Sequence, residues 1–84
     1  MKKRKRSGKL KFGTAIREFR LEAGLSQDGL GDRMDMGKSY ISALENDHRA
    51  PSPEMIVRLA RALGIAPGAI LDKAAESYPA DDTE

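Results

Sequence analysis

Residues 25–46 constrain the fold of this chain more than any other segment, because they carry signals for two short helices with almost nothing between them. Ser26 has the side chain of a helix N-cap and begins the first helix. Residues 34–37 then supply a tight turn, and a second helix follows with Ile41 and Leu44 on its inward face. Such a short turn forces the second helix across the first, so that one face of the pair packs and the other stays exposed.

The rest of the chain continues the helical pattern, without strand-like alternation. Apolar residues recur at helical steps between positions 12 and 23, and Gly24 is placed to end that helix. A Ser-Pro pair at 52–53 marks the start of another helix, which Gly64 ends, and a short last helix opens with Pro67. The sequence therefore predicts an all-α domain of five short helices.

Two glycines fall inside the first helix of residues 25–46. Each of Gly29 and Gly31 costs about 1 kcal/mol relative to alanine in a helix, so this helix depends on the tertiary packing of Leu30 and Met34. Gly31 has a predicted steric role, because it lies where the two helices approach each other. Gly29 has no such role.

The chain has 84 residues, which is enough for one small domain, and a net charge of only +2. The charge is unevenly distributed, since residues 1–11 contain seven basic residues and no acid, whereas acids outnumber lysine at the other end. We divide the chain into a flexible basic arm at 1–9, a helical domain at 10–73 and an acidic, frayed tail at 74–84. The arm either follows a phosphate backbone or is simply solvated.

The composition argues against several classes of protein. There is no cysteine, and the one histidine, His48, has no second histidine with which to share a metal. No glycine-rich phosphate loop follows a strand, and no apolar run approaches the roughly 20 residues that span a bilayer. We therefore expect no enzyme, metal, cofactor, small-molecule ligand or membrane contact, and a cytoplasmic, nucleoid-associated protein.

Several short segments, in a fixed order and spacing, carry a resemblance to a known family. They are Ile16–Arg17 with Arg20, Gly24–Gln27 with Leu30, Ser39–Ser42 running to Leu44–Glu45, Arg49–Ser52 and Leu59–Ile65. Together they resemble the Cro/repressor-type helix-turn-helix family, the lambda-repressor-like domains also called the XRE type. The resemblance implies a five-helix DNA-binding domain with the helix-turn-helix at its second and third helices, and the function of a sequence-specific transcription regulator, specifically a repressor.

In this interpretation the third helix enters the major groove of double-stranded DNA. The residues expected to reach base edges are Lys38, Ser39, Ser42 and Ala43. Those expected to contact the DNA backbone are Gln27, Tyr40, Asn46, Arg49, Lys9 and Lys11. Taken singly, each polar member of this set is equally an ordinary solvated side chain. Glu45 and Arg20 are expected to pair with each other in support of the fold.

The chain departs from the family pattern at three positions. Gly31 stands where alanine is common, and Asp35 and Asp47 stand where glycine is usual. Aspartate tolerates a left-handed backbone, so the fold should survive with some loss of stability. Asp47 is expected to place a negative charge near the phosphate path and to weaken backbone binding slightly.

One recognition helix covers only a few base pairs, so we expect a homodimer that binds a near-palindromic operator, with its two recognition helices about 34 Å apart. The expected dimer contacts are Ile65, Ala66, Ile70 and Leu71, although the same residues could instead close the core of the monomer. The alternative function is that of a protein-interaction module, such as an antitoxin or a transcriptional bridging factor, with secondary DNA binding.

Overall fold

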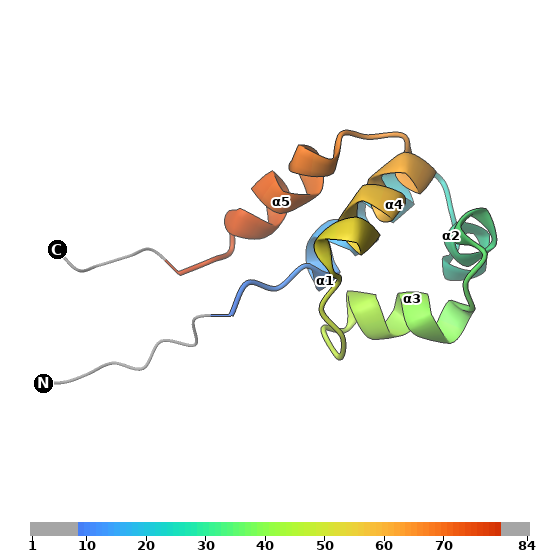
Figure 1. Ribbon diagram of the computed structural model, residues 1–84, viewed down its shortest axis with the longest axis horizontal. Helices are drawn as coiled ribbons and strands as arrows, with labels where there is room; N and C mark the ends of the chain where they lie inside the picture. The colour runs from blue at the N-terminus through green and yellow to red at the C-terminus, as the bar shows by residue number, and fades with distance from the viewer. Residues whose placement is uncertain (1–8, 80–84) are drawn as a thin grey trace, which may run out of the picture.

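A computed structural model describes residues 9–79 and contains the helices that the sequence signals predict (Figure 1). The described chain is all-α, as predicted. It contains, in order, α1 (Gly13–Glu22), α2 (Gln27–Met34), α3 (Lys38–Glu45), α4 (Pro53–Leu63) and α5 (Pro67–Ala75). The predicted basic arm, except for its last residue, and residues 80–84 of the predicted tail lie outside the described residues.

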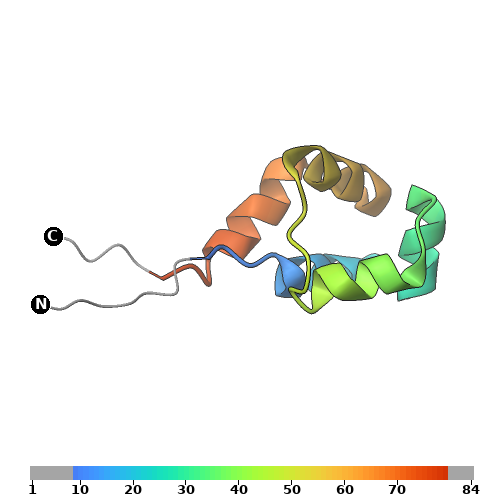
Figure 2. The ribbon, with the colours of Figure 1, turned by 60° about the horizontal axis from the view of Figure 1, so that its bottom comes forward.

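The five helices pack around one core. In Figure 1, α3 lies along the lower edge of the molecule, with α4 above it and α2 at one end. Figure 2 shows α2 standing across that end of α3, as the short turn between them requires. Every helix contributes a fully buried side chain to the core, namely Ile16, Leu30, Ile41, Leu44, Leu59 and Ile70.

The predicted helix caps are present. Ser26 Oγ accepts a hydrogen bond from Gly29 N at 2.9 Å, and Ser52 Oγ accepts one from Met55 N at 3.1 Å. Asp35 ends α2 with a φ of 57°, in the left-handed conformation expected of that turn. The caps and the turn therefore fix the boundaries of α2 and the start of α4.

Gly31 has the steric role that the sequence indicated. It is buried, and a Cβ atom there would lie 2.5 Å from the carbonyl oxygen of Met36. The close approach is to the turn that leads into α3, which brings the two helices together. A Cβ at Gly29 would meet nothing closer than Ser26 Oγ, at 3.3 Å, so no comparable requirement exists there.

Helix α5 runs to Ala75, two residues past the predicted end of the domain at residue 73. Ala74 is only 4% exposed and contributes to the core. The sequence signal ended early because small residues in an acidic segment look alike whether they are packed or solvated.

Candidate nucleic-acid interface

A buried ion pair fixes α3 to the two helices that precede it. Arg20 Nε on α1 lies 2.5 Å from Glu45 Oε2 on α3, and Arg20 Nη2 lies 3.0 Å from Glu45 Oε1. Both residues are less than 10% exposed. The Glu45 carboxylate raises the pKa of Arg20 above its ordinary value, mainly through this hydrogen bond, so the guanidinium stays charged. The expected pairing of these two residues is present and is bidentate.

Gln27 extends this ion pair to α2. Its side-chain Nε2 donates to Glu45 Oε1 at 3.1 Å, and the residue is half-buried. The third donor group of Arg20, Nη1, contacts the carbonyl oxygen of Leu25 at 2.8 Å. As a result, the start of α2 and the end of α3 are held on one guanidinium–carboxylate pair, and the orientation of α3 depends on it.

The opposite face of α3 is open. Lys38 and Ser39 are exposed in its first turn, and Ser42 and Ala43 are half-exposed one turn later. The side-chain amide of Asn46 donates to the carbonyl oxygen of Ser42 at 3.0 Å and to its hydroxyl oxygen at 3.2 Å. All four predicted base-contacting residues thus lie on α3 and are accessible to solvent. Asn46, at the end of that helix, is hydrogen-bonded to one of them, Ser42.

Two of the predicted backbone contacts lie against each other. Tyr40 is half-buried on the flank of α3, and Arg49 Cζ lies 5.2 Å from the centre of its ring. Such a cation–π contact favours this position of the guanidinium, by about 0.5–1 kcal/mol at an exposed site, and does not neutralise its charge. Arg49 therefore lies with its charge beside α3.

Asp47 makes a contact that the sequence did not indicate. Its Oδ1 accepts a hydrogen bond from Gly13 N at 2.9 Å, so the carboxylate caps the first turn of α1. The N-terminus of α1 thus reaches the end of α3 and binds this carboxylate. Asp47 is nevertheless exposed, and the expectation that its charge lies near the phosphate path and weakens backbone binding stays a prediction. Sequence reasoning missed Gly13, where a Cβ would overlap the carbonyl oxygen of Glu45.

Lys9 and Lys11, the described part of the basic arm, are exposed beside this junction. Together with His48 and Arg49 they line a cavity of about 320 Å³ between the start of the described chain and the loop after α3. Figure 2 shows this first segment passing beside the end of α3. The structure thus gathers basic side chains from two distant segments just beyond the C-terminal end of α3, where Asp47 lines the same cavity.

The predicted dimer contacts fall into two groups. Ile70 is fully buried and belongs to the core of the monomer, and Ile65 is half-buried against that core. Ala66 and Leu71 are exposed, Leu71 by 46%. Leu71 lies at an apolar groove of about 390 Å³ between α4 and α5, which the sequence did not reveal; its other lining residues are Pro53, Ile56, Val57, Pro67 and Gly68.

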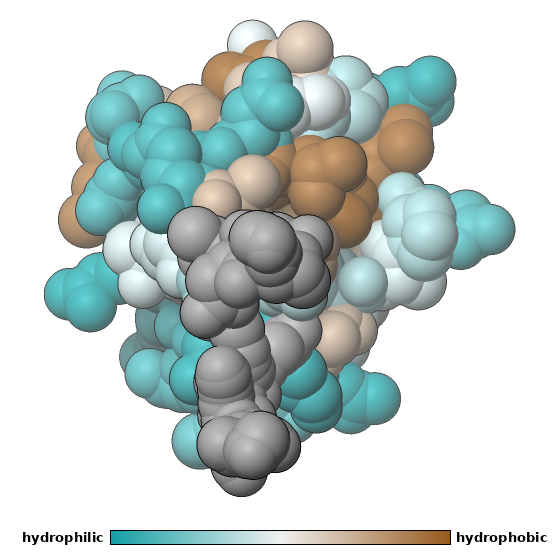
Figure 3. Space-filling view, turned by 90° about the vertical axis from the view of Figure 1, so that its left-hand side faces the viewer, coloured by the Kyte–Doolittle hydropathy of each residue, from teal (hydrophilic) through white to brown (hydrophobic). Residues whose placement is uncertain are grey.

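This groove forms part of a larger apolar surface. Figure 3 looks onto the end of the molecule where α5 lies and shows apolar surface gathered to one side of it. Leu71, Ala75 and Tyr78 recur along and just beyond α5 at helical steps, and all three are exposed. The surface is separate from the exposed face of α3.

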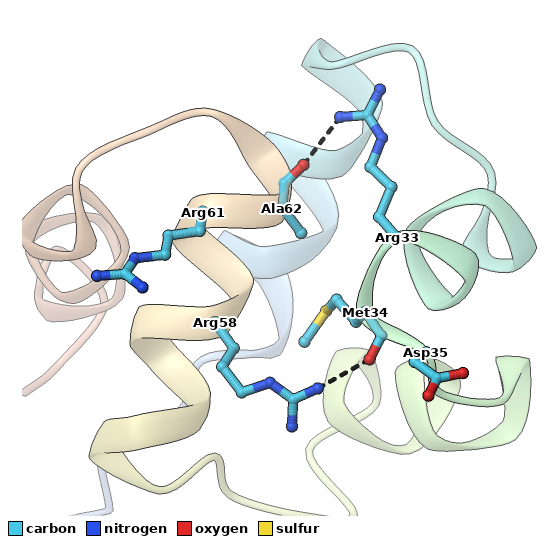
Figure 4. Close-up of a pocket in the computed structure, with 6 residues that line it drawn as sticks. All are labelled: Arg33, Met34, Asp35, Arg58, Arg61 and Ala62. Atoms are coloured by element: carbon cyan, nitrogen blue, oxygen red, sulfur yellow. Dashed lines mark hydrogen bonds between the residues drawn. The ribbon is translucent and has the colours of Figure 1, made fainter.

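Two arginines clamp α2 against α4 (Figure 4). Arg33, in the last turn of α2, donates to the carbonyl oxygen of Ala62 at 2.9 Å, and Arg58 on α4 donates to that of Met34 at 2.8 Å. Each arginine thus satisfies a carbonyl at the end of the other helix, where no intrahelical donor is available. The nearby side chain of Arg61 points away from α2 in this view. This reciprocal capping joins α2 to α4.

Among residues 9–79 no helix combines the length and apolar character that crossing a bilayer requires. The same residues contain no group of side chains suited to hold a metal ion.

The crossed α2 and α3, with α3 exposed on one face, define a helix-turn-helix domain. The chain belongs to the helix-turn-helix family, whose sequence profile matches residues 16–70, and is a DNA-binding transcription regulator of the XRE type rather than an enzyme. It is 35% identical over 65 residues to the control protein C.BamHI of Bacillus amyloliquefaciens, a match that covers 76% of this chain and 80% of that protein.

Solved structures of similar proteins agree with this assignment. The restriction-modification controller protein C.AhdI from Aeromonas hydrophila has a TM-score of 0.68 and 38% identity, over 73% of this chain and 92% of its own. The master regulator for biofilm formation SinR, solved in complex with DNA, has a TM-score of 0.67 and 27% identity, over 73% of this chain and 98% of its own. The lambda-repressor-like fold predicted from the sequence is confirmed.

Proposed function

We propose that the protein is a sequence-specific repressor that binds double-stranded DNA as a homodimer, with α3 of each subunit in the major groove. The observation that carries the proposal is the exposed face of α3, held in place from behind by the buried Arg20–Glu45 pair. A major groove admits one helix, and a rigidly held helix loses little conformational entropy on binding. The similarity to SinR, which was solved in complex with DNA, supports the DNA-binding part of the proposal.

Base recognition is assigned to the exposed face of α3. Lys38 can donate to O6 and N7 of guanine, and Ser39 and Ser42 can donate or accept at a base edge. Ala43 offers a methyl group to thymine. With so few hydrogen-bonding groups on this face, much of the affinity must come from the phosphate backbone and from the shape of the DNA.

Backbone contacts are assigned to residues at both ends of the helix pair, namely Gln27, Tyr40, Asn46, Arg49, Lys9 and Lys11. The amide of Gln27 keeps one free N–H group while it is bonded to Glu45. Arg49, Lys9 and Lys11 supply the positive charge that releases counterions from the duplex. These contacts set the register of α3 without reading the sequence.

Dimerisation is assigned to α5. Leu71 is exposed on α5 and Ala66 is exposed just before it, and the packing of Ile65 and Ile70 beneath holds that surface in shape. The apolar groove beside Leu71 offers a site for the same leucine of a second copy, since a two-fold axis pairs identical surfaces. Because this surface is separate from α3, a dimer leaves both recognition helices free for a near-palindromic operator. A dimer bound over a promoter would then exclude the polymerase.

The proposal is tested by selecting bound sequences from random duplex DNA at a stated salt concentration. We expect enrichment of a two-fold symmetric site. Lys38→Ala should relax the selection at one position of each half-site, whereas Arg61→Ala, which removes the same charge from an exposed site on α4, should not. Absence of any enriched sequence would refute specific recognition, and would favour the protein-interaction alternative.

Dimerisation is tested by sedimentation equilibrium. Leu71→Asp should convert the dimer to a monomer, because it places a charge in an apolar contact. Leu21→Asp is the matched control, since Leu21 is 56% exposed on α1 and takes no part in the proposed contact. A dimer that survives the first substitution would refute the assignment to α5.

A further inference from the structure

We propose that Asn46 is a positioning residue for base recognition: it binds the hydroxyl oxygen of Ser42, so that Ser42 presents its hydroxyl proton to the DNA and selects a base that carries an acceptor in the major groove. This role rests on the proposed entry of α3 into that groove. It gives a direction to the contact of Ser42, whose hydroxyl by itself can either donate or accept.

The orientation of the Asn46 side-chain amide follows from its two contacts. The amide nitrogen lies 3.0 Å from the carbonyl oxygen of Ser42, one turn earlier on α3. A backbone carbonyl can only accept, so the group that approaches it must be the amide N–H rather than the amide oxygen. The same nitrogen lies 3.2 Å from Ser42 Oγ, which therefore accepts a hydrogen bond from Asn46.

The backbone holds these two side chains next to each other. Asn46 is the C-cap residue of α3, and its backbone N–H donates to the same Ser42 carbonyl oxygen at 2.9 Å. The main-chain bond and the side-chain bond together occupy both lone pairs of that oxygen. Ser42 is half-exposed and Asn46 is exposed, so the pair lies at the surface of α3 that is proposed to face the DNA. Side chains four residues apart on a helix are natural partners for such a bond.

The bond from Asn46 leaves the Ser42 hydroxyl with its proton and one lone pair. Within residues 9–79 this hydroxyl has no other hydrogen-bond partner, so its proton is available to a ligand. A hydroxyl that accepts a bond is also polarised into a better donor, and more so where DNA excludes water.

Bases differ in what they offer to such a donor. In the major groove guanine offers N7 and O6 and thymine offers O4 as acceptors, whereas cytosine offers only its N4 amino group. A cytosine at the contacted position would leave the hydroxyl proton of Ser42 without a partner. Ser42 held by Asn46 should therefore favour guanine or thymine over cytosine.

The same bonds restrict the backbone contact assigned to Asn46 above. A side-chain amide has two N–H groups, and the one nitrogen already serves both acceptors of Ser42. A phosphate must therefore compete with Ser42 for these protons. The two roles are distinguishable, because a phosphate contact changes the affinity for every sequence by the same factor, whereas a contact through Ser42 changes the preference at one base pair.

The test uses two duplexes of the selected operator that differ at the base pair whose selection Ser42→Ala relaxes: one carries the selected pair and the other carries it reversed in one half-site. Affinities of the full chain are measured by fluorescence anisotropy at one salt concentration. In Asn46→Asp the carboxylate can only accept, so the hydroxyl of Ser42 would donate to it and turn its lone pairs toward the base. Asn46→Ala removes the bond. Both substitutions are repeated in Ser42→Ala as the matched background.

We expect the unsubstituted protein to bind the selected pair about threefold to tenfold more tightly than the reversed pair, which is the effect of one hydrogen bond. Asn46→Asp should shift this ratio toward the reversed pair by a similar factor, and Asn46→Ala should reduce it. In the Ser42→Ala background neither substitution should change the ratio, although the added charge of Asn46→Asp should weaken binding to both duplexes. An unchanged ratio when Ser42 is present would overturn the proposal, because Asn46 would then act as a backbone contact only.

A second measurement uses the protein without DNA. The NMR couplings between Hα and the two Hβ atoms of Ser42 should have the values of a single side-chain rotamer, and Asn46→Ala should average them. Averaged couplings in the unsubstituted protein would overturn the proposal. Absence of any selected operator would refute the proposed function, and this role of Asn46 with it. An operator whose base preference is insensitive to Asn46→Asp would refute the role of Asn46 alone.

Discussion

Removal of the Glu45 carboxylate should cost this domain a large part of its stability. In Glu45→Ala the guanidinium of Arg20 stays buried and charged, and it loses the contacts at 2.5 Å and 3.0 Å that satisfy two of its donors. Breaking a buried pair by removing one partner typically costs about 3–5 kcal/mol. A single domain has a total free energy of unfolding of roughly 5–15 kcal/mol, so this loss is a large fraction of the total, and a domain at the lower end of the range would be close to unfolded.

The assay is equilibrium unfolding in urea, followed by the helical circular dichroism signal. Glu45→Gln should lower the free energy of unfolding less than Glu45→Ala does, since glutamine keeps an acceptor and the shape of the side chain. The double variant Arg20→Ala/Glu45→Ala should lose clearly less free energy of unfolding than the two single variants lose together, because it leaves no charge unpaired. Glu18→Ala, which breaks the exposed Lys73 pair, should barely change the midpoint.

Two results would refute this reasoning. One is a decrease of less than about 1 kcal/mol in the free energy of unfolding of Glu45→Ala, since exposed ion pairs contribute no more than that. The other is additivity of the two single substitutions, which would mean that the buried contacts are not energetically coupled.

Gly13→Ala and Gly68→Ala, both near the start of a helix, should have opposite effects on thermal stability. Gly13→Ala should lower the melting temperature, because it forces a methyl group onto the Glu45 carbonyl oxygen. Gly68→Ala should raise it, because the new methyl group meets nothing within 4 Å and the helix gains up to about 1 kcal/mol of propensity. Similar melting temperatures for the two variants would contradict the steric argument. Gly68→Ala also narrows the apolar groove, so the more stable protein should dimerise more weakly in sedimentation experiments. Ser52→Ala should lose about 1 kcal/mol in urea unfolding through its hydrogen bond to Met55 N, and no loss would mean that solvent replaces this cap.

Local signals predicted the fold well because each one acts within a single turn. Ser26 and Ser52 cap the helices that they precede, and Asp35 and Gly64 take positive φ where the sequence places a helix end. Helical periodicity identified the fully buried core residues Ile41 and Leu44. The exposed face of α3 follows from the same periodicity, so the candidate base-contacting residues could be chosen before the structure was known.

What the sequence by itself determined is therefore the number, the order and the inward faces of the helices, because these depend on interactions between residues no more than a few positions apart. Only the tertiary structure decided how those helices are joined. The bonds Gly13–Asp47, Arg20–Glu45 and Arg33–Ala62 connect residues 34, 25 and 29 positions apart. The family resemblance indicated the Arg20–Glu45 pair. The spacing of residues in the sequence indicates none of the three bonds, since the approach of two distant backbones depends on the packing of the whole core. For that reason the sequence indicated only that Asp47 lies near the end of α3, whereas the fold shows that its carboxylate also accepts a hydrogen bond from the first residue of α1.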